Sequence, residues 1–377
     1  MKKVYLDNAA TTPIHQDVIN TITSVMQETY GNPSSTHQFG RKARVLVEEA
    51  RKAIAHYFNV TSGEVVFTSG GGEADNLILR NAVENLEVKH FITSKIEHHA
   101  VLHVIESLEK EHDITVSYVD LNDKGEVEFN HLENLLKETS QKTLVSLMAI
   151  NNELGNILDI QRVCVLCKKY DALFHSDTVQ VIGHYPLDLQ NTPIDFITAS
   201  AHKFHGPKGV GFAIIKKGFG IKPILIGGEQ ERGARAGTEN VHNIAGMHKA
   251  LDLCYTEMGK DMKYISALKS YFIDQLKTLN EDISFNGCSA ELEKSTYITL
   301  NVRFPKDIPM LLFNLDLKGI AASGGSACQS GSTKGSHVLN EILSVDESMK
   351  TSVRFSFSRY NTKDEIDYTL SILKAII

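Results

Sequence analysis

The sequence predicts an α/β protein, with a large domain built on a mostly parallel sheet and a smaller α+β domain after it. Short apolar stretches of strand length alternate with helical patterns over the first 250 or so residues, as expected for crossover connections between parallel strands. The pattern changes near residue 255, where a long amphipathic helix leads into alternating strands. The length of 377 residues also suits two domains, since one domain usually has roughly 100–200 residues.

The large domain is expected at 15–255, and its elements follow from hydrophobic periodicity. Apolar residues at helical spacing predict a first helix over about 39–58. A buried strand at 64–68 follows, and a glycine turn leads to a helix from 73 to about 83. Further strands are predicted at 90–93, 115–119, 144–150, 172–175 and 196–198, with helices at about 100–109 and 160–170.

The small domain is expected at 256–377, and the N-terminal segment 1–14 is expected to pack with it. An amphipathic pattern predicts a helix over about 261–279, and a strand follows at 297–302. Residues 353–358 alternate strictly between apolar and polar, which predicts a strand with one apolar and one polar face. Thr362 and Glu365 form a capping-box pattern that opens a last helix to about residue 376.

Composition excludes several classes of protein. Hydrophobic residues make up 42% and charged residues 23%, which is ordinary globular composition. The formal net charge is −7, the reverse of the basic excess of a nucleic-acid binder, so no direct nucleic-acid partner is expected. The apolar runs, such as 147–150, are far shorter than the roughly 20 residues that span a bilayer. Five dispersed cysteines make a disulfide framework improbable, so we expect a cytoplasmic protein with free thiols and no membrane partner.

The glycine turn TSGGGEADN (68–76) lies between a predicted strand and a predicted helix. Gly71 and Gly72 would let main-chain N–H groups approach an anion, and the positive end of the helix dipole would favour it. The segment is neither G-x-G-x-x-G nor a Walker A loop. A plain tight turn is the more common explanation for this feature taken alone.

Two charged residues follow predicted strands. Asp177 comes directly after the strand at 172–175, where open α/β sheets bind ligands, although an Asp there also suits a helix N-cap. Lys203 follows the strand at 196–198 and lies between His202 and His205. A partly desolvated lysine can bond covalently to a carbonyl, and pyridoxal 5′-phosphate needs such a lysine, an acid partner for its ring nitrogen and a phosphate cradle. These three parts together favour that cofactor over a merely basic loop.

Three further residues have chemistry that the cofactor reaction would use. Cys328 lies in a run of glycine and serine, typical of an exposed, mobile thiol or of a plain linker. Arg354 lies on the polar face of its strand, where it would bind a carboxylate with two parallel hydrogen bonds or remain solvated. His98 would lie over an aromatic cofactor or on the surface at a helix start. Cys164 and Cys167 fall in a helical pattern without a second Cys/His pair, so no metal site is predicted.

Taken together, these segments resemble the cysteine desulfurases of NifS/IscS type, which belong to the class V aminotransferase family of pyridoxal-phosphate enzymes of fold type I. The resemblance runs almost end to end. Its motifs are YLDNAATTP (5–13), YGNPSS (30–35), VFTSG (66–70), EH (97–98), NNELG (151–155), HK (202–203), RGARAGT (232–238), SAC (326–328) and RFS (354–356).

The resemblance implies a role for each matching residue. Lys203 would bind the cofactor covalently, Asp177 would pair with the pyridinium nitrogen, and His98 would stack on the ring as a further catalytic residue. Cys328 would accept the sulfur. The remaining implied contacts are Gln180 to the phenolic oxygen; Gly71, Gly72, Ser200 and His202 to the phosphate; Thr238 to the phosphate from the second subunit of a homodimer; and Asn152, Arg354 and Asn32 to the substrate, with Asn152 also near the cofactor.

Gly72 departs from the family pattern, which usually has threonine there. The missing hydroxyl removes a hydrogen bond to phosphate, and charge-assisted bonds are worth roughly 1.5–3 kcal/mol. We therefore expect weaker retention of the cofactor. The segment from Cys328 to about Val338 has a length similar to that of the group with a mobile acceptor cysteine (group I).

The implied reaction converts L-cysteine to L-alanine and transfers sulfur to Cys328 as a persulfide. A sulfur-acceptor protein would follow, and the sequence leaves both an iron–sulfur scaffold and tRNA thiolation open. The alternatives on the same fold are a selenocysteine lyase and a class V aminotransferase, of which the aminotransferase would have no use for Cys328. A non-catalytic scaffold is a third alternative, but the intact Lys203, Asp177, Cys328 and Arg354 oppose it.

Overall fold

The computed structural model describes residues 2–324 and 335–377. Its centre is a seven-stranded sheet in the order β2-β8-β7-β6-β5-β3-β4. The strands are β2 (Val65–Thr68), β3 (His90–Thr93), β4 (Thr115–Tyr118), β5 (Thr143–Ser146), β6 (Leu173–Asp177), β7 (Phe196–Ser200) and β8 (Gly211–Ile215).

The mostly parallel sheet confirms the predicted fold class. β3 pairs in parallel with β4 and β5, and β5, β6 and β7 continue the parallel arrangement. β8 is antiparallel to both of its neighbours, β2 and β7. β8 was not predicted, because its apolar run is short and Gly209 and Gly211 flank Val210 at its start.

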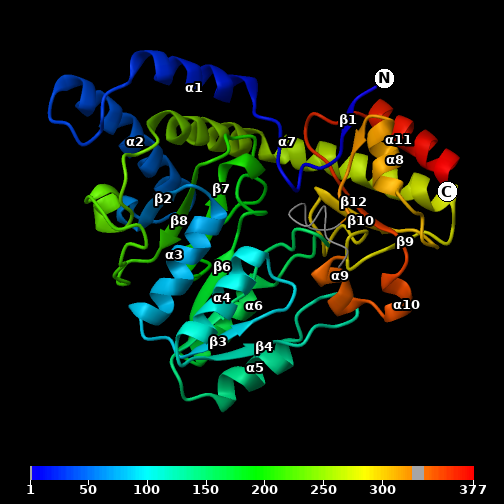
Figure 1. The fold of residues 1–377 in the computed structure, drawn as a ribbon, viewed down its shortest axis with the longest axis horizontal. Helices are drawn as coiled ribbons and strands as arrows, with labels where there is room; N and C mark the ends of the chain where they lie inside the picture. The colour runs from blue at the N-terminus through cyan, green and yellow to red at the C-terminus, as the bar shows by residue number, and fades with distance from the viewer. Residues whose placement is uncertain (1, 325–334) are drawn as a thin grey trace.

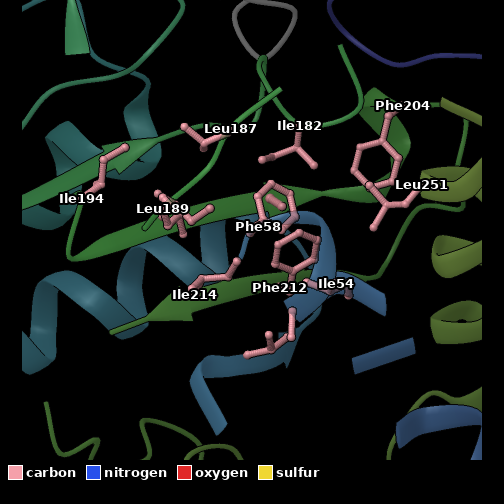
Figure 2. Packing of buried hydrophobic residues seen from close by; sticks show 14 of the residues in the cluster. Ile54, Phe58, Ile182, Leu187, Leu189, Ile194, Phe204, Phe212, Ile214 and Leu251 are labelled. Atoms are coloured by element: carbon pink, nitrogen blue, oxygen red, sulfur yellow. The ribbon is translucent and has the colours of Figure 1, made fainter. Parts of the chain in front are cut away.

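Helices cover both faces of this sheet. α3 (Gly71–Glu84) and α4 (His99–Glu111) share one apolar cluster with strand residues such as Val66 and Phe91. α2 (Gln38–Tyr57) and α6 (Ile160–Lys169) share the opposite cluster with Val65 and Phe67. Figure 2 shows part of this second cluster, in which Phe58 and Phe212 pack with Ile54 and Ile214. Alternate residues of β2 thus enter opposite cores, as the period of a strand requires. Two helices that no pattern had predicted are α1 (Gln16–Glu28) and α5 (Phe129–Glu138).

The long helix α7 (Val241–Leu279) joins the two halves of the molecule. It contacts α1 and α2 toward one end and α11 (Lys363–Ile376) toward the other, and Figure 1 shows it running from the N-terminal helices to the C-terminal elements. The predicted start near 261 was wrong by 20 residues, so the expected boundary at 255 lies inside this helix. Gly246 obscured the pattern; its missing side chain lets α7 approach Ile22, whose Cγ1 would lie 2.5 Å from a Cβ.

The C-terminal part has its own antiparallel sheet and core. β10 (Thr299–Arg303) pairs with β12 (Ser352–Ser356) and β9 (Ser284–Phe285). Thr362 and Glu365 form the predicted capping box at the start of α11. The short helices are α8 (Leu311–Leu317), α9 (His337–Ile342) and α10 (Val345–Ser348). Within the described ranges, no helix is both long and apolar enough to cross a membrane.

The N-terminal segment lies against these C-terminal elements. β1 (Val4–Tyr5) pairs in parallel with β11 (Ile320–Ala321), and the Leu6 main-chain oxygen accepts from Ser356 N at 2.7 Å. Figure 1 accordingly places the N-terminal strand beside the last helix. This contact brings residues 7–12 to the carboxyl edge of the large sheet.

Candidate active site

A cavity of about 220 Å³ lies at the carboxyl ends of β6 and β7. The N-termini of α3 and α4 border it, and the N-terminal segment and β12 close it. The lining residues that the sequence had singled out are Gly71, Gly72, His98, Asn152, Asp177, Gln180, Ser200, His202, Lys203 and Arg354. Ten separate predictions thus meet in one place.

Lys203 ends a short 3₁₀ turn, Ala201–Lys203, that follows β7 directly. Its Nζ donates to the main-chain oxygens of Ala9 at 2.6 Å and Ala10 at 2.9 Å. Because the same N-terminal segment binds the main chain beside Lys203, with Thr12 N 2.9 Å from His202 O, the amine is held at the cavity wall. A lysine so placed is available for covalent chemistry with a carbonyl.

Asp177 is the last residue of β6 and is buried. Its Oδ1 accepts from Val179 N at 2.9 Å, in a turn rather than at a helix N-cap. Burial raises the pKa of Asp177 to about 6, and the buried Asp75 adds to the rise. A ring nitrogen that carries a proton would be a suitable counter-ion for this buried carboxylate.

Two more buried carboxyls lie near Asp177, and neither was predicted as a site residue. Burial raises the pKa of Asp75 to about 7, and burial raises the pKa of Glu97 to about 8. Asp75 comes from α3 and lines the cavity, where its Oδ1 lies 3.4 Å from His175 Nε2. Asp75 follows the glycine turn by three residues, and that spacing was the only signal available.

The glycine turn between β2 and α3 lines the cavity with Gly71 and Gly72. Gly70 has φ +154°, which residues with a side chain rarely adopt, and a Cβ on Gly71 would lie 2.7 Å from Val179 Cγ2. Ser200, at the end of β7, lies against Gly70. The exposed N–H groups at the start of α3 and its dipole favour a phosphate here. Gly72 is different, because a Cβ there would meet only Ala100 Cβ, at 3.9 Å.

His98, His202 and Gln180 surround the same space. His98 is the N-cap of α4, and its Nδ1 accepts from Ala100 N at 3.1 Å, which leaves the proton on Nε2. Burial lowers the pKa of His98, and burial lowers the pKa of His202 to about 4. Both rings are therefore neutral at pH 7. Gln180 Nε2 donates to Ala9 O at 3.0 Å, so its carbonyl end remains available.

Arg354 lies on β12 and is 1% exposed, so the solvated alternative is wrong. Its Nη1 donates to Asn152 O at 2.8 Å and its Nη2 pairs with Asp7 Oδ1 at 3.0 Å. A buried guanidinium that lines a cavity is suited to bind a carboxylate.

Three predicted residues do not line this cavity. Thr238 is exposed and lines a separate cavity of about 360 Å³ beside Ser69. Asn32 is exposed, and its Oδ1 accepts from Ser34 N at 2.9 Å. Cys328 lies outside the described residues. The roles expected for all three stay predictions.

The other cysteines do not form a reactive site. Cys164 and Cys167 are buried on α6, within the apolar cluster. Burial raises the pKa of the Cys164 thiol to about 11. In the part of the chain that the structure describes, no group of three or more His, Cys, Asp or Glu side chains is placed to hold a metal ion.

Three features place the fold in the fold type I class of pyridoxal-phosphate enzymes. They are the mostly parallel sheet, the lysine and carboxylate at its strand ends, and the second, smaller sheet. The family model described as Aminotransferase class-V matches residues 4–369. The chain belongs to this family.

Similar proteins cover the chain from end to end. It is 41% identical to "Cysteine desulfurase IscS" of Dictyoglomus turgidum, over 100% of this chain and 95% of the relative. It is 40% identical to "Putative cysteine desulfurase IscS 1" of Bacillus subtilis, over 97% and 96%. Among solved structures, a "NifS-like protein" superposes with a TM-score of 0.91 at 35% identity, over 100% and 99% of the two chains. A NifS-like protein from Rickettsia africae gives 0.88 at 34%, also over 100% and 99%.

Proposed function

We propose that this chain is a pyridoxal-phosphate-dependent cysteine desulfurase, which converts L-cysteine to L-alanine and transfers sulfur to Cys328. One observation carries the proposal: Lys203, Asp177 and Arg354 line a single cavity of about 220 Å³. Full-length similarity to proteins named cysteine desulfurases supports it.

The residues present fit the cofactor. Gly71, Ser200 and the start of α3 would hold its phosphate, and Asp177 would pair with its ring nitrogen, because that buried carboxylate lines the same cavity. His98 would lie against the ring, and Lys203 would bind it covalently. When bound, pyridoxal phosphate supplies an electron sink that stabilises negative charge at the substrate Cα.

Arg354 and Asn152 would bind and orient the substrate. The guanidinium of Arg354 would hold the α-carboxylate, and Asn152 lies beside it. Lys203 Nζ would then act as the base that removes the proton from Cα and as the acid that returns it.

The sulfur step would use Cys328. Its thiolate would attack the substrate sulfur; the S–S bond forms as the bond between the substrate Cβ and sulfur breaks, and the Cβ takes up a proton to become the methyl group of alanine. Ser323, five residues before Cys328, forms two main-chain hydrogen bonds with Arg354. Ser323 N donates to Arg354 O at 3.2 Å, and Arg354 N donates to Ser323 O at 2.6 Å. Since five extended residues span at most about 18 Å, the chain length allows Cys328 to reach the cavity.

The proposed assembly is a cytoplasmic homodimer in which Thr238 of each chain contacts the phosphate of the other. Its exposed position beside the glycine turn supports this. The persulfide would pass to an acceptor protein, either an iron–sulfur scaffold or a tRNA-thiolation enzyme.

The test incubates the purified, cofactor-loaded protein with L-cysteine and measures L-alanine together with persulfide on the protein. Equal amounts of alanine and transferred sulfur are expected. Borohydride reduction should attach the pyridoxyl group to the peptide that contains Lys203. Conversion of a 2-oxo acid in place of sulfur release would identify an aminotransferase instead, and a protein that binds no cofactor would overturn the proposal.

A further inference from the structure

The guanidinium of Arg354 already has an anionic partner inside the protein. Arg354 is 1% exposed, and its one ion pair among the described residues is with Asp7, at 3.0 Å from Nη2. Its Nη1 bonds to Asn152 O at 2.8 Å, whereas its Nε has no hydrogen-bond partner in the described chain. Both Nη atoms are therefore held by protein partners, and the guanidinium is fixed where Arg354 lines the cavity.

Asp7 itself is held from several sides. It follows β1, and its main chain forms a parallel bridge with Ser356 of β12. The same Oδ1 that pairs with Arg354 accepts from Ser323 Oγ at 2.8 Å. Asp7 does not line the cavity, so it faces Arg354 from outside the space that a substrate would occupy.

A buried cation without a counter-ion is costly, since desolvation removes the water that would stabilise its charge. An arginine in that state would take up whatever small anion the solvent provides. A carboxylate fixed behind the guanidinium reduces this attraction and holds the planar group in one orientation.

We propose that Asp7 is the internal counter-ion and positioning residue of Arg354, which orients the guanidinium and keeps inorganic anions from occupying the carboxylate site. This inference rests on the proposed role of Arg354 in binding an amino-acid carboxylate. The pair closes a separation of 347 residues in sequence and lies where strand β12 and the N-terminal segment are joined beside the cavity.

The test compares the wild-type holoenzyme with Asp7→Asn, which removes the charge and keeps the shape. The dissociation constant of L-alanine is measured from the absorbance change of the bound cofactor, at chloride from 10 to 200 mM, with ionic strength held constant by a bulky sulfonate salt. We expect the constant to rise at least fivefold with chloride in Asp7→Asn and less than twofold in the wild type. The control Asp274→Asn, on an exposed position of α7, should match the wild type.

Two further variants keep the inference open to refutation. Asp7→Glu retains the charge and should restore chloride insensitivity, and Asp7→Ser provides a second uncharged variant if Asp7→Asn does not fold. The same weak chloride dependence in the wild type and the uncharged variants would overturn the inference. Because alanine binding requires no turnover, failure of the wild type to release sulfur from cysteine would count against the proposed function alone.

Discussion

The imidazole of His184 donates from Nε2 to the main-chain oxygen of Lys203 at 3.0 Å. The ring is buried. The hydroxyl of Tyr297, in the C-terminal part, donates to the main-chain oxygen of His184 at 3.2 Å. The main chain of the lysine at the cavity wall is thus held by a side chain that is neutral at pH 7, because burial lowers the pKa of His184 to about 4.

This burial predicts a pH-dependent loss of stability. A histidine in the unfolded chain titrates near pH 6.5. Below that pH the unfolded state therefore binds a proton at His184, whereas the folded state does not bind it until about pH 4. The free energy of unfolding therefore falls as the pH drops from 6.5 to 4, by up to about 3 kcal/mol from this group. His184→Gln, which keeps a donor and does not titrate, should reduce the slope of unfolding free energy against pH over that range, while other histidines with a lowered pKa, such as His202, keep their share of it. His56→Gln, at an exposed position of α2, should not, and equal slopes in all three proteins would disprove the assignment.

Gly72→Thr is expected to strengthen cofactor binding. A side chain has room there, since the nearest atom to a Cβ is Ala100 Cβ at 3.9 Å, and a hydroxyl would add a charge-assisted hydrogen bond worth roughly 1.5–3 kcal/mol. Fluorescence titration of the apoprotein should show affinity at least tenfold higher. The matched variant Gly71→Ala should bind more weakly, because its Cβ would come 2.7 Å from Val179 Cγ2. An unchanged affinity in Gly72→Thr would refute the explanation for this glycine.

Cys328→Ser should abolish persulfide and alanine formation while the cofactor absorbance band remains. Serine lacks the nucleophilic sulfur that the transfer needs, and Lys203, Asp177 and the glycine turn are untouched. Cys167→Ala is the control, because the Cys167 thiol is buried in the apolar cluster on α6. This substitution should leave turnover near the wild-type rate. Full sulfur release by Cys328→Ser would remove Cys328 from the mechanism.

Arg51 and Glu231 form a buried ion pair that anchors the segment before Thr238. Arg51 bonds to both Glu231 oxygens, at 2.7 and 2.9 Å, and Phe67 N donates to the same carboxylate at 2.9 Å. Arg51→Met would leave that carboxylate buried without its cation, at a cost of about 3–5 kcal/mol. Arg80 is more exposed and is paired with Glu111 at 3.1 Å. Arg80→Met should therefore lower the free energy of unfolding by less than about 1 kcal/mol. Chemical denaturation measures both, and similar small losses would show that the Arg51 pair is not structurally important.

Much of the site was predictable because of a general property of parallel sheets. Asp177 ends β6 and Lys203 follows the neighbouring strand β7, and the carboxyl ends of parallel strands meet at one edge. Residue chemistry at strand ends was therefore enough to predict that the carboxylate and the lysine lie close together. The start of α7 was missed because glycines weaken a periodic pattern, although they permit close helix packing.

The sequence by itself determined the alternation of strands and helices, the capping box at Thr362 and the lysine–carboxylate pair at adjacent strand ends, because each depends on neighbours within a few residues. Only the tertiary structure decided that Arg354 is buried against Asp7, 347 residues away, and that Asp75 and Glu97 lie near Asp177. Such contacts depend on how separate elements pack, and no local period or motif records the distance between them.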